Sequence, residues 1–371
     1  MLKSFDTDVF VVGGGPAGLA AAIAARQQGF RVMVADSAKP PIDKACGEGL
    51  MPDAQLALLQ LGLKIDSSET GTFQGIKFIG PEGAVLARFP RGEGIGIRRT
   101  LLHQILLDFA SRLGVETMWG TQVAGLQDDC VSAGKRVIRS RWVIGADGQH
   151  SLIRKWAGLA ETREHTQRIG IRQHFHIEPL SDFVEIYWGA HGQAYVTPIG
   201  KKEVCVALIS RKKFASFEEG MSLFPQLARH LKNADRTTSV RGAITISRGL
   251  KFVCRDRIAL LGEASGSVDA LTGEGLAMAF RQALALSYAL ASNNLSLYQA
   301  AHRQISVLPS FMSQSMLLMD KSSWVRQRAL RALVKKPVLF ERMLSVHVGE
   351  LSLRDFGIGS MVNFGWQLLV A

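Results

Sequence analysis

The feature that most constrains the fold is a glycine cluster directly after a short apolar stretch near the N-terminus. Residues Val9 to Val12 read as a strand covered on both faces, and the spacing Gly13-x-Gly15-x-x-Gly18 follows at once. An alanine-rich helix then begins and ends near Gly29. In such a turn Gly13 permits the tight bend, Gly15 lets the backbone approach a pyrophosphate, and Gly18 allows close helix packing.

The residues around this fingerprint complete a dinucleotide site. Pro16 and Ala17 lie at the start of the helix, where free N–H groups and the helix dipole favour phosphate. The next strand, residues 31–35, ends in Asp36, at the spacing from which a carboxylate binds ribose hydroxyls. We therefore predict dinucleotide binding rather than a merely glycine-rich turn.

Two later segments repeat the pattern of an apolar strand that ends in glycine and an acidic residue. Trp142 to Ile144 runs into Gly145-Ala146-Asp147-Gly148, and Ile258 to Leu261 runs into Gly262-Glu263. Because ligands of parallel α/β sheets gather at the carboxyl ends of the strands, we expect the three segments to line one cofactor site.

The two later segments also resemble a known family. The pattern Gly145-Ala146-Asp147-Gly148-x-x-Ser151-x-x-Arg154 resembles the second fingerprint of flavoprotein hydroxylases related to p-hydroxybenzoate hydroxylase, and residues 260–275 resemble the third. The resemblance implies FAD, with Asp147, Gly262 and Glu263 among its ligands. In that superfamily an aspartate binds the ribityl chain at the position of Glu263, whose side chain is one methylene longer. Arg99 resembles the arginine that helps to hold FAD.

The segment Thr272-Gly273-Glu274-Gly275 precedes a long helix that begins near Leu276. Reduced flavin carries negative charge near its N1 and C2 carbonyl, and the backbone N–H groups at Gly273, Gly275 and Leu276 are placed to stabilise it. The alternative is that these glycines only allow the helix to pack tightly.

The subfamily is less sharply indicated. Lys44 to Pro52 resembles both the Cys-Gly-Gly-Gly-Leu segment of geranylgeranyl reductases and the Gly-Glu-Ser-Leu-Leu-Pro segment of flavin-dependent halogenases. The reductase resemblance makes Cys46 and Tyr195 candidate catalytic residues, although Cys46 also fits an inert packed thiol. Lys77 lies where the halogenase lysine falls, or is an ordinary strand lysine.

A strand at residues 172–176 places Arg172, His174 and His176 on one face. That face either meets substrate or faces solvent. The sequence shows no Ser/His/Asp or paired-carboxylate constellation, which fits chemistry carried by the cofactor itself. Four well-separated cysteines without nearby histidines predict neither a disulfide framework nor a metal site, and favour a reducing, cytoplasmic location.

The fold class predicted for the 371 residues is α/β, with a Rossmann-like FAD-binding domain of glutathione reductase type, an antiparallel β-sheet substrate domain and C-terminal helices. The apolar fraction of 47% excludes a disordered chain. The expected division is a discontinuous FAD domain at residues 1–71, 98–167 and 250–290, a substrate domain at 72–97 and 168–249, and helices over 291–371.

Half of the net charge of +12 falls in one segment. Residues 321–343 hold seven Lys/Arg and one acid on an amphipathic helical pattern, a local net of +6. Such a helix predicts peripheral contact with anionic lipid or an acidic carrier, or else it caps the substrate domain with its charges solvated. No membrane span and no nucleic-acid module is expected.

These features predict an FAD-dependent oxidoreductase. The reaction favoured at this stage is hydroxylation of an apolar or aromatic small molecule through a hydroperoxyflavin, with NAD(P)H as a transient reductant because no second glycine fingerprint is present. The alternatives are double-bond reduction of the geranylgeranyl reductase kind, and halogenation. A purely binding or structural flavoprotein is disfavoured by the complete cofactor motifs.

Overall fold

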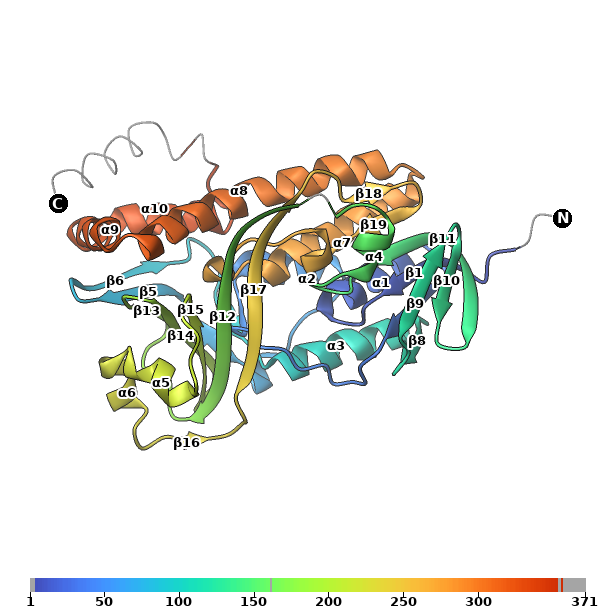
Figure 1. The fold of residues 1–371 in the computed structure, drawn as a ribbon. Helices are drawn as coiled ribbons and strands as arrows, with labels where there is room; N and C mark the ends of the chain where they lie inside the picture. The colour runs from blue at the N-terminus through green and yellow to red at the C-terminus, as the bar shows by residue number, and fades with distance from the viewer. Residues whose placement is uncertain (1–3, 161, 353–354, 356–371) are drawn as a thin grey trace.

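A computed structural model of the protein describes residues 4–160, 162–352 and 355 (Figure 1). The predicted C-terminal helical region, 291–371, therefore falls partly outside the described residues. Within them the chain forms two large sheets, one small sheet and a set of helices.

The first large sheet carries the glycine fingerprint. Its strand order is β18 (Cys254–Arg255), β19 (Ile258–Leu260), β11 (Arg136–Gly145), β1 (Thr7–Val12), β2 (Val32–Asp36) and β8 (Glu116–Trp119). The pairs from β19 to β8 are parallel, so the carboxyl ends of β1, β2, β11 and β19 meet at one edge. An antiparallel extension of β9 (Val123–Gln127) and β10 (Cys130–Ala133) pairs with β11.

Both faces of this sheet are covered, which explains the continuous apolar runs of its strands. Val9 and Val11 pack among the helices α1 (Pro16–Gln27), α3 (Arg99–Arg112) and α7 (Gly275–Ala291). Phe10 and Val12 point to the other face, beneath β9, β10 and α4 (Leu152–Trp156). Strands buried on both faces show no alternation of polar and apolar residues.

The second large sheet lies beside the first and is antiparallel except for one parallel pair. Its order is β16 (Asp235–Arg236), β12 (Thr162–His176), β15 (Glu203–Ser210), β14 (Gly192–Gly200), β13 (Val184–Trp188), β5 (Gly75–Gly80) and β6 (Gly83–Arg88), with β17 (Arg241–Leu250) also paired to β12. Figure 1 shows β12 and β17 as a long ribbon pair that joins the two halves of the molecule.

Short elements complete the region between the sheets. A three-stranded sheet joins β3 (Gly49–Leu50), β7 (Gly94–Gly96) and β4 (Gly71–Phe73), and α2 (Pro52–Gln60) follows β3. Helices α5 (Phe217–Ser222) and α6 (Pro225–His230) cover the outer face of the second sheet. One-turn 3-10 helices lie at η1 (Ser67–Glu69), η2 (Gly262–Ser265) and η3 (Ala270–Thr272).

Three helices follow the cofactor motifs: α8 (Leu295–Lys321), α9 (Ser323–Lys335) and α10 (Pro337–His347). The apolar side of α9 is buried at Leu330 and Leu333, and a Cβ placed on Gly80 of β5 would lie 2.7 Å from Leu330. Arg331 forms an ion pair with Glu82 at 2.6 Å, between β5 and β6. The basic amphipathic helix therefore packs its apolar side against this hairpin.

A buried ionic network joins α8 to the second sheet. The guanidinium of Arg168 on β12 pairs with Asp320 on α8, and both side chains are almost completely buried. Gln193 of β14 accepts from Arg168 at 3.1 Å and donates to Asp320 at 2.8 Å. Arg211 reaches the same carboxylate at 2.9 Å. Charges buried at this depth are stable only when they are paired and hydrogen-bonded.

The predicted α/β fold class is confirmed, with a parallel nucleotide-type sheet, a largely antiparallel second sheet and C-terminal helices. Among the described residues, no helix is long and apolar enough to cross a membrane.

Candidate flavin site

A cavity of about 1120 Å³ lies where the carboxyl edge of the parallel sheet faces the second sheet. Fourteen of the fifteen predicted site residues line it: Gly13, Gly15, Pro16, Ala17, Cys46, Asp36, Arg99, Asp147, Tyr195, Gly262, Glu263, Gly273, Gly275 and Leu276. The exception is Gly18, which packs against the backbone of Gly13 inside the strand–turn–helix unit. Segments as far apart as Gly13 and Leu276, separated by 263 residues along the chain, thus meet at one cavity, as the strand topology requires.

The three fingerprint glycines serve different geometric needs. Gly13 has φ +107°, and a Cβ there would lie 2.3 Å from the carbonyl oxygen of Ala146. A Cβ on Gly18 would lie 1.8 Å from the carbonyl oxygen of Gly13, so helix and turn touch there. Gly15 differs, because its Cβ would enter open space with only the Arg99 guanidinium nearby, at 4.0 Å. The missing side chain at Gly15 therefore leaves room for a ligand to approach the backbone at the start of α1.

Arg99 supplies positive charge at this point. It is the first residue of α3 and lines the cavity, and its Nε is buried without a hydrogen-bond partner among the described residues. A buried, unpaired guanidinium N–H is costly unless a ligand accepts from it. An anionic group beside Gly15 would provide that acceptor.

Asp36 lies at the end of β2, as predicted. One carboxylate oxygen accepts from the Gly14 N–H at 2.7 Å, and the other accepts from the Ala38 N–H at 2.8 Å. The carboxylate braces the glycine turn in this way and still faces the cavity. Each oxygen keeps a further lone pair with which it could accept from a ribose hydroxyl.

Asp147 also lines the cavity, but its carboxylate has a second task. It accepts from the Ser151 hydroxyl at 2.5 Å and from the N–H groups of Leu152 and Ile153 at 2.7 and 3.2 Å. These contacts satisfy N–H groups at the start of α4. Arg154 of the same motif donates to the Ala264 carbonyl at 3.0 Å, which ties the second motif to the third.

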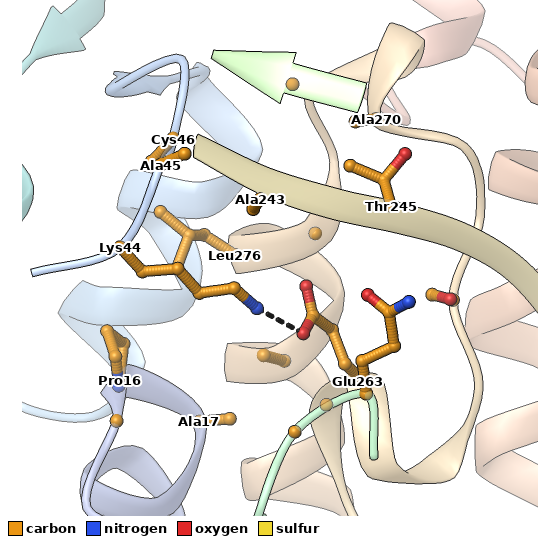
Figure 2. Close-up of a pocket in the computed structure, with 18 of the residues that line it drawn as sticks. Pro16, Ala17, Lys44, Ala45, Cys46, Ala243, Thr245, Glu263, Ala270 and Leu276 are labelled. Carbon is orange, nitrogen blue, oxygen red and sulfur yellow. Dashed lines mark hydrogen bonds and ion pairs between the residues drawn. The ribbon is translucent and has the colours of Figure 1, made fainter. Parts of the chain in front are cut away.

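Glu263 forms an ion pair across the cavity. Its carboxylate lies 2.5 Å from the Lys44 Nζ, and both side chains are a little over two-fifths exposed. Figure 2 shows this pair above Pro16 and Ala17, with Cys46 on the same loop as Lys44. The longer glutamate thus reaches Lys44, a charged wall residue that the sequence did not single out.

The segment Thr272–Gly275 forms another part of the wall. Gly273 adopts φ +69°, the left-handed conformation that favours glycine, and Gly275 is the first residue of α7. A Cβ at either glycine would meet nothing within 4 Å. Open space at both positions argues against the packing explanation and leaves the N-terminus of α7 facing the cavity.

Both candidate catalytic residues line the cavity. Cys46 accepts a hydrogen bond from the Glu48 N–H at 3.4 Å, and burial raises the pKa of its thiol, so it stays protonated. The Tyr195 hydroxyl donates to the Leu271 carbonyl at 2.9 Å, and burial raises its pKa as well. The proton of Tyr195 is therefore already engaged by the backbone.

Sequence reasoning missed the importance of Glu48. This residue is 2% exposed and has φ +59°, an unusual conformation for a glutamate. Its carboxylate accepts from the Arg99 N–H at 2.9 Å and lies 2.7 Å from the His174 Nε2 and 3.5 Å from the Arg172 guanidinium. The available signal was that Glu48 stands where the resembling reductase segment has glycine.

The strand face at 172–176 is consequently not a solvent face. Arg172 and His174 are buried against Glu48, whereas His176 is exposed. The His174 Nε2 faces the Glu48 carboxylate at 2.7 Å, and the His174 Nδ1 lies 2.9 Å from the Thr238 hydroxyl and 3.3 Å from the Arg172 guanidinium. The Cys205 thiol, the His174 ring and the Glu48 carboxylate form a group whose possible metal-ligand atoms lie within 4.8 Å of one another. Because Arg172 already supplies the positive charge, we interpret this group as a buried ion-pair cluster.

Lys77 does not enter the cavity wall. Its Nζ lies 2.9 Å from the buried Glu185 carboxylate, which also accepts from Ser181 and Tyr187. The neighbouring side chains Ile76, Val184 and Ile186 line the cavity instead. Since successive strand residues point to opposite faces, Lys77 belongs to the outer face of the second sheet.

The cavity fits FAD on features of its own. The unpaired Arg99 Nε, the open space at Gly15 and the two open glycines before α7 are features that a dinucleotide with a redox-active ring would use. Fold and cavity together define a Rossmann-type, FAD-dependent oxidoreductase. The chain belongs to the FAD binding domain family, which matches residues 6–294.

Curated relatives and solved structures agree with this class. The menaquinone reductase of Mycolicibacterium smegmatis is 27% identical over 299 residues, 72% of each chain. The digeranylgeranylglycerophospholipid reductase of Methanosarcina acetivorans is 25% identical over 295 residues, 72% of this chain and 71% of that protein. The rifampicin monooxygenase of Streptomyces venezuelae is 31% identical over 165 residues, 41% of this chain and 34% of that protein.

Two solved structures show the shared fold. A flavoprotein/dehydrogenase from Cytophaga hutchinsonii superposes with a TM-score of 0.84 at 18% identity, covering 98% of both chains. A halogenase in complex with FAD superposes with a TM-score of 0.75 at 18% identity, covering 97% of this chain and 85% of that one.

Proposed function

We propose that this oxidoreductase saturates a carbon–carbon double bond in an apolar, isoprenoid-like substrate. The observation that carries this proposal is an apolar wall on the second sheet that faces the cofactor cavity. Cross-strand neighbours Ile76 and Val184 form one part of it, and Ile186, Tyr195 and Ala207 form the next. Phe73, Met51 and Ile209 extend the wall. Such a surface suits a hydrocarbon chain, which needs shape and burial rather than hydrogen bonds.

Two further observations favour reduction over the alternatives. The relatives that align with about 72% of this chain are named for the reduction of menaquinone and of a digeranylgeranyl lipid. The halogenase alternative loses its lysine, because Lys77 is paired with Glu185 on the outer face of the sheet. The first observation supports the reductase as the first candidate in place of the hydroxylase favoured on sequence alone, and the second argues against the halogenase.

Bound and reduced, FAD supplies a hydride to one carbon of the double bond, and the other carbon then requires a proton. Cys46 is the group we assign to that proton. Its thiol is neutral, lines the cavity and lies in hydrogen-bond contact with the Glu48 N–H, which can stabilise the thiolate left behind. The charges of Arg99 and Arg172 favour the thiolate and the Glu48 carboxylate opposes it. The hydroxyl of Tyr195, by contrast, is held by a carbonyl.

We also propose that NAD(P)H, binding transiently, or a partner reductase replenishes the electrons. The chain has a single Gly-x-Gly-x-x-Gly fingerprint, and the cavity at that fingerprint is the FAD site. The sequence therefore offers a second dinucleotide no fingerprint of its own.

An anaerobic turnover experiment tests the reductase proposal. Reduced, FAD-loaded protein is mixed without oxygen with a polyprenyl quinone, and the product is analysed by mass spectrometry. A gain of two hydrogens that lies in the prenyl chain, and that persists after the quinol ring is reoxidised to the quinone, supports double-bond reduction. A product that forms only with oxygen and carries an added oxygen atom refutes it and selects the second candidate, a monooxygenase, which the similarity to rifampicin monooxygenase favours.

Cys46→Ser tests the proton assignment. Loss of a positioned general acid is expected to slow product formation by about 10²- to 10⁴-fold, with FAD binding unchanged. Cys130→Ser is the matched control, because Cys130 lies on β10, away from the cavity. Equal rates for both variants would remove Cys46 from the mechanism.

A lipid substrate raises the question of membrane contact, for which we propose the outer side of α9 and the start of α10. Trp324 and Val338 are 56% and 65% exposed there, and Lys335 and Lys336 are exposed between them. The guanidinium of Arg328 lies 4.6 Å from the Trp324 ring centroid. An interfacial tryptophan among basic residues fits an anionic bilayer surface.

Vesicle flotation tests this contact. Wild-type protein should float with vesicles that contain anionic lipid, and Lys335→Glu with Lys336→Glu should weaken partitioning by more than about tenfold, since each basic residue contributes about 1 kcal/mol. Lys155→Glu is the control, an exposed lysine on α4. Equal flotation of all variants, or binding to an acidic carrier protein but to no vesicle, would refute the lipid surface.

A further inference from the structure

Behind the Thr272–Gly275 segment lies a cluster of buried ionisable side chains. Glu274, which immediately precedes α7, is 2% exposed, and His347, at the end of α10, is 8% exposed. Asp53 of α2 is 6% exposed. Three elements far apart in the sequence thus bring titratable groups to the back of one wall of the cofactor cavity. His347 lies beyond residues 6–294, so the family domain alone does not contain this cluster.

The contacts of His347 define its proton. Its Nε2 lies 3.2 Å from the Thr272 carbonyl oxygen, which can only accept, so Nε2 carries a hydrogen. The other ring nitrogen, Nδ1, faces the Glu274 Oε2 at 3.8 Å. The His347 Nδ1 and the Glu274 Oε2 are both buried and lack a hydrogen-bond partner among the described residues. A single proton between them would satisfy both atoms once a small side-chain rotation closes the distance.

The surrounding charges fix how many protons the pair holds. Burial and the nearby Asp53 carboxylate raise the pKa of Glu274 to about 8, and burial lowers the pKa of His347. Asp53 is paired with Arg281 of α7 at 2.8 Å. Just beyond α10, Glu350 is paired with Arg91. Near neutral pH the pair therefore holds one ionisable proton, with the glutamic acid and the imidazole both uncharged.

We propose that Glu274 and His347 are positioning residues that hold the Thr272–Gly275 segment in place and take up a second proton when the bound flavin is reduced. Thr272, Gly273 and Gly275 line the cavity, while the Glu274 and His347 side chains lie behind them. The inference rests on the proposed FAD site, and it does not depend on the substrate.

The charge balance of this step is simple. Two-electron reduction adds negative charge on the cavity side of the segment, and a proton from solvent adds to the His347 Nδ1. One N–H bond forms, no covalent bond breaks within the protein, and the new imidazolium faces Glu274 and Asp53. A positive charge behind the segment compensates negative charge in front of it, which stabilises the reduced state.

The test is the midpoint potential of the bound flavin, measured by spectroelectrochemistry from roughly pH 6 to 9, the range in which a proton-coupled group changes the slope. Glu274→Gln keeps the size of the side chain and cannot ionise. His347→Gln keeps an N–H for the Thr272 carbonyl and cannot take a second proton. The potential should fall with pH more steeply in the wild type than in His347→Gln, whereas Glu274→Gln, which keeps the imidazole that accepts the proton, should retain the steeper slope. Glu341→Gln, an exposed position on α10, is the matched control and should follow the wild type.

Two results would overturn the inference. One is that the wild type and His347→Gln have parallel potential–pH curves. The other, available from the wild type alone if a variant does not fold, is a reduction-induced infrared difference spectrum without a histidine protonation band. If no substrate is ever reduced but His347→Gln flattens the pH dependence, the inference stands and the proposed function fails.

Discussion

Alanine substitutions at Gly15 and Gly18, made separately, should have different effects. Gly15→Ala should weaken FAD binding, and Gly18→Ala should destabilise the fold. Gly15 has φ −70° and ψ 177°, which alanine adopts freely, and its Cβ would point into open cavity. Gly18 is inside α1, where its Cβ would lie 1.8 Å from a backbone oxygen that cannot move aside. The two substitutions are chemically identical and three residues apart, so only their surroundings differ.

The expected magnitudes follow from those surroundings. Gly15→Ala should leave the free energy of unfolding of the cofactor-free protein unchanged or raise it by about 0.4–1 kcal/mol, because alanine restricts the unfolded chain. The methyl group would push a phosphate away from the start of α1 and weaken one charge-assisted hydrogen bond. At about 1.5–3 kcal/mol for such a bond, the Kd for FAD should rise about 10- to 100-fold. Gly18→Ala should instead destabilise the fold by at least about 1–3 kcal/mol through overpacking.

Chemical denaturation of the cofactor-free proteins gives the stabilities, and quenching of flavin fluorescence during titration gives the Kd values. The reasoning fails if Gly15→Ala binds FAD within about threefold of wild type, a difference under 1 kcal/mol. It also fails if Gly18→Ala unfolds at the same denaturant concentration as wild type.

Three further outcomes follow from buried polar groups. Burial lowers the pKa of His302 to about 4. As the pH falls, the unfolded chain therefore binds the His302 proton before the folded chain does, and the free energy of unfolding should fall by about 3 kcal/mol between about pH 6.5 and pH 4. Acid denaturation should show a smaller fall for His302→Asn. Asp320→Asn leaves Arg168 without its closest carboxylate and should cost about 3–5 kcal/mol in urea unfolding, whereas Asp8→Asn at an exposed pair should cost under about 1 kcal/mol; equal costs would contradict the burial argument. Tyr195→Phe removes a hydrogen bond to a backbone carbonyl and should cost about 0.5–1.5 kcal/mol with turnover nearly unchanged, so a turnover loss above about 100-fold would make Tyr195 catalytic.

The cofactor half of the molecule was readable from sequence because its requirements are local. A strand, a turn and a helix start must have glycine where the backbones meet, as Gly13 and Gly18 do at 2.3 and 1.8 Å. Each of the three motifs directly follows a strand, so in a parallel sheet the three motifs are expected at the same edge. No long-range packing had to be guessed, since parallel strands bring their carboxyl ends together by geometry alone.

The charged parts of the site could not be read in the same way, because each depends on a partner that the chain supplies from elsewhere. Glu48 meets His174 across 126 residues, and Glu263 meets Lys44 across 219. The same holds for α9, where a helical wheel shows an apolar side but not the hairpin that covers it. An amphipathic pattern states that a face must be buried, and the tertiary structure decides whether lipid or protein buries it. The hairpin at Gly80 and Glu82 covers the apolar face of α9. A membrane contact would therefore use Trp324 and the basic side chains on the other side of α9, together with Val338 at the start of α10.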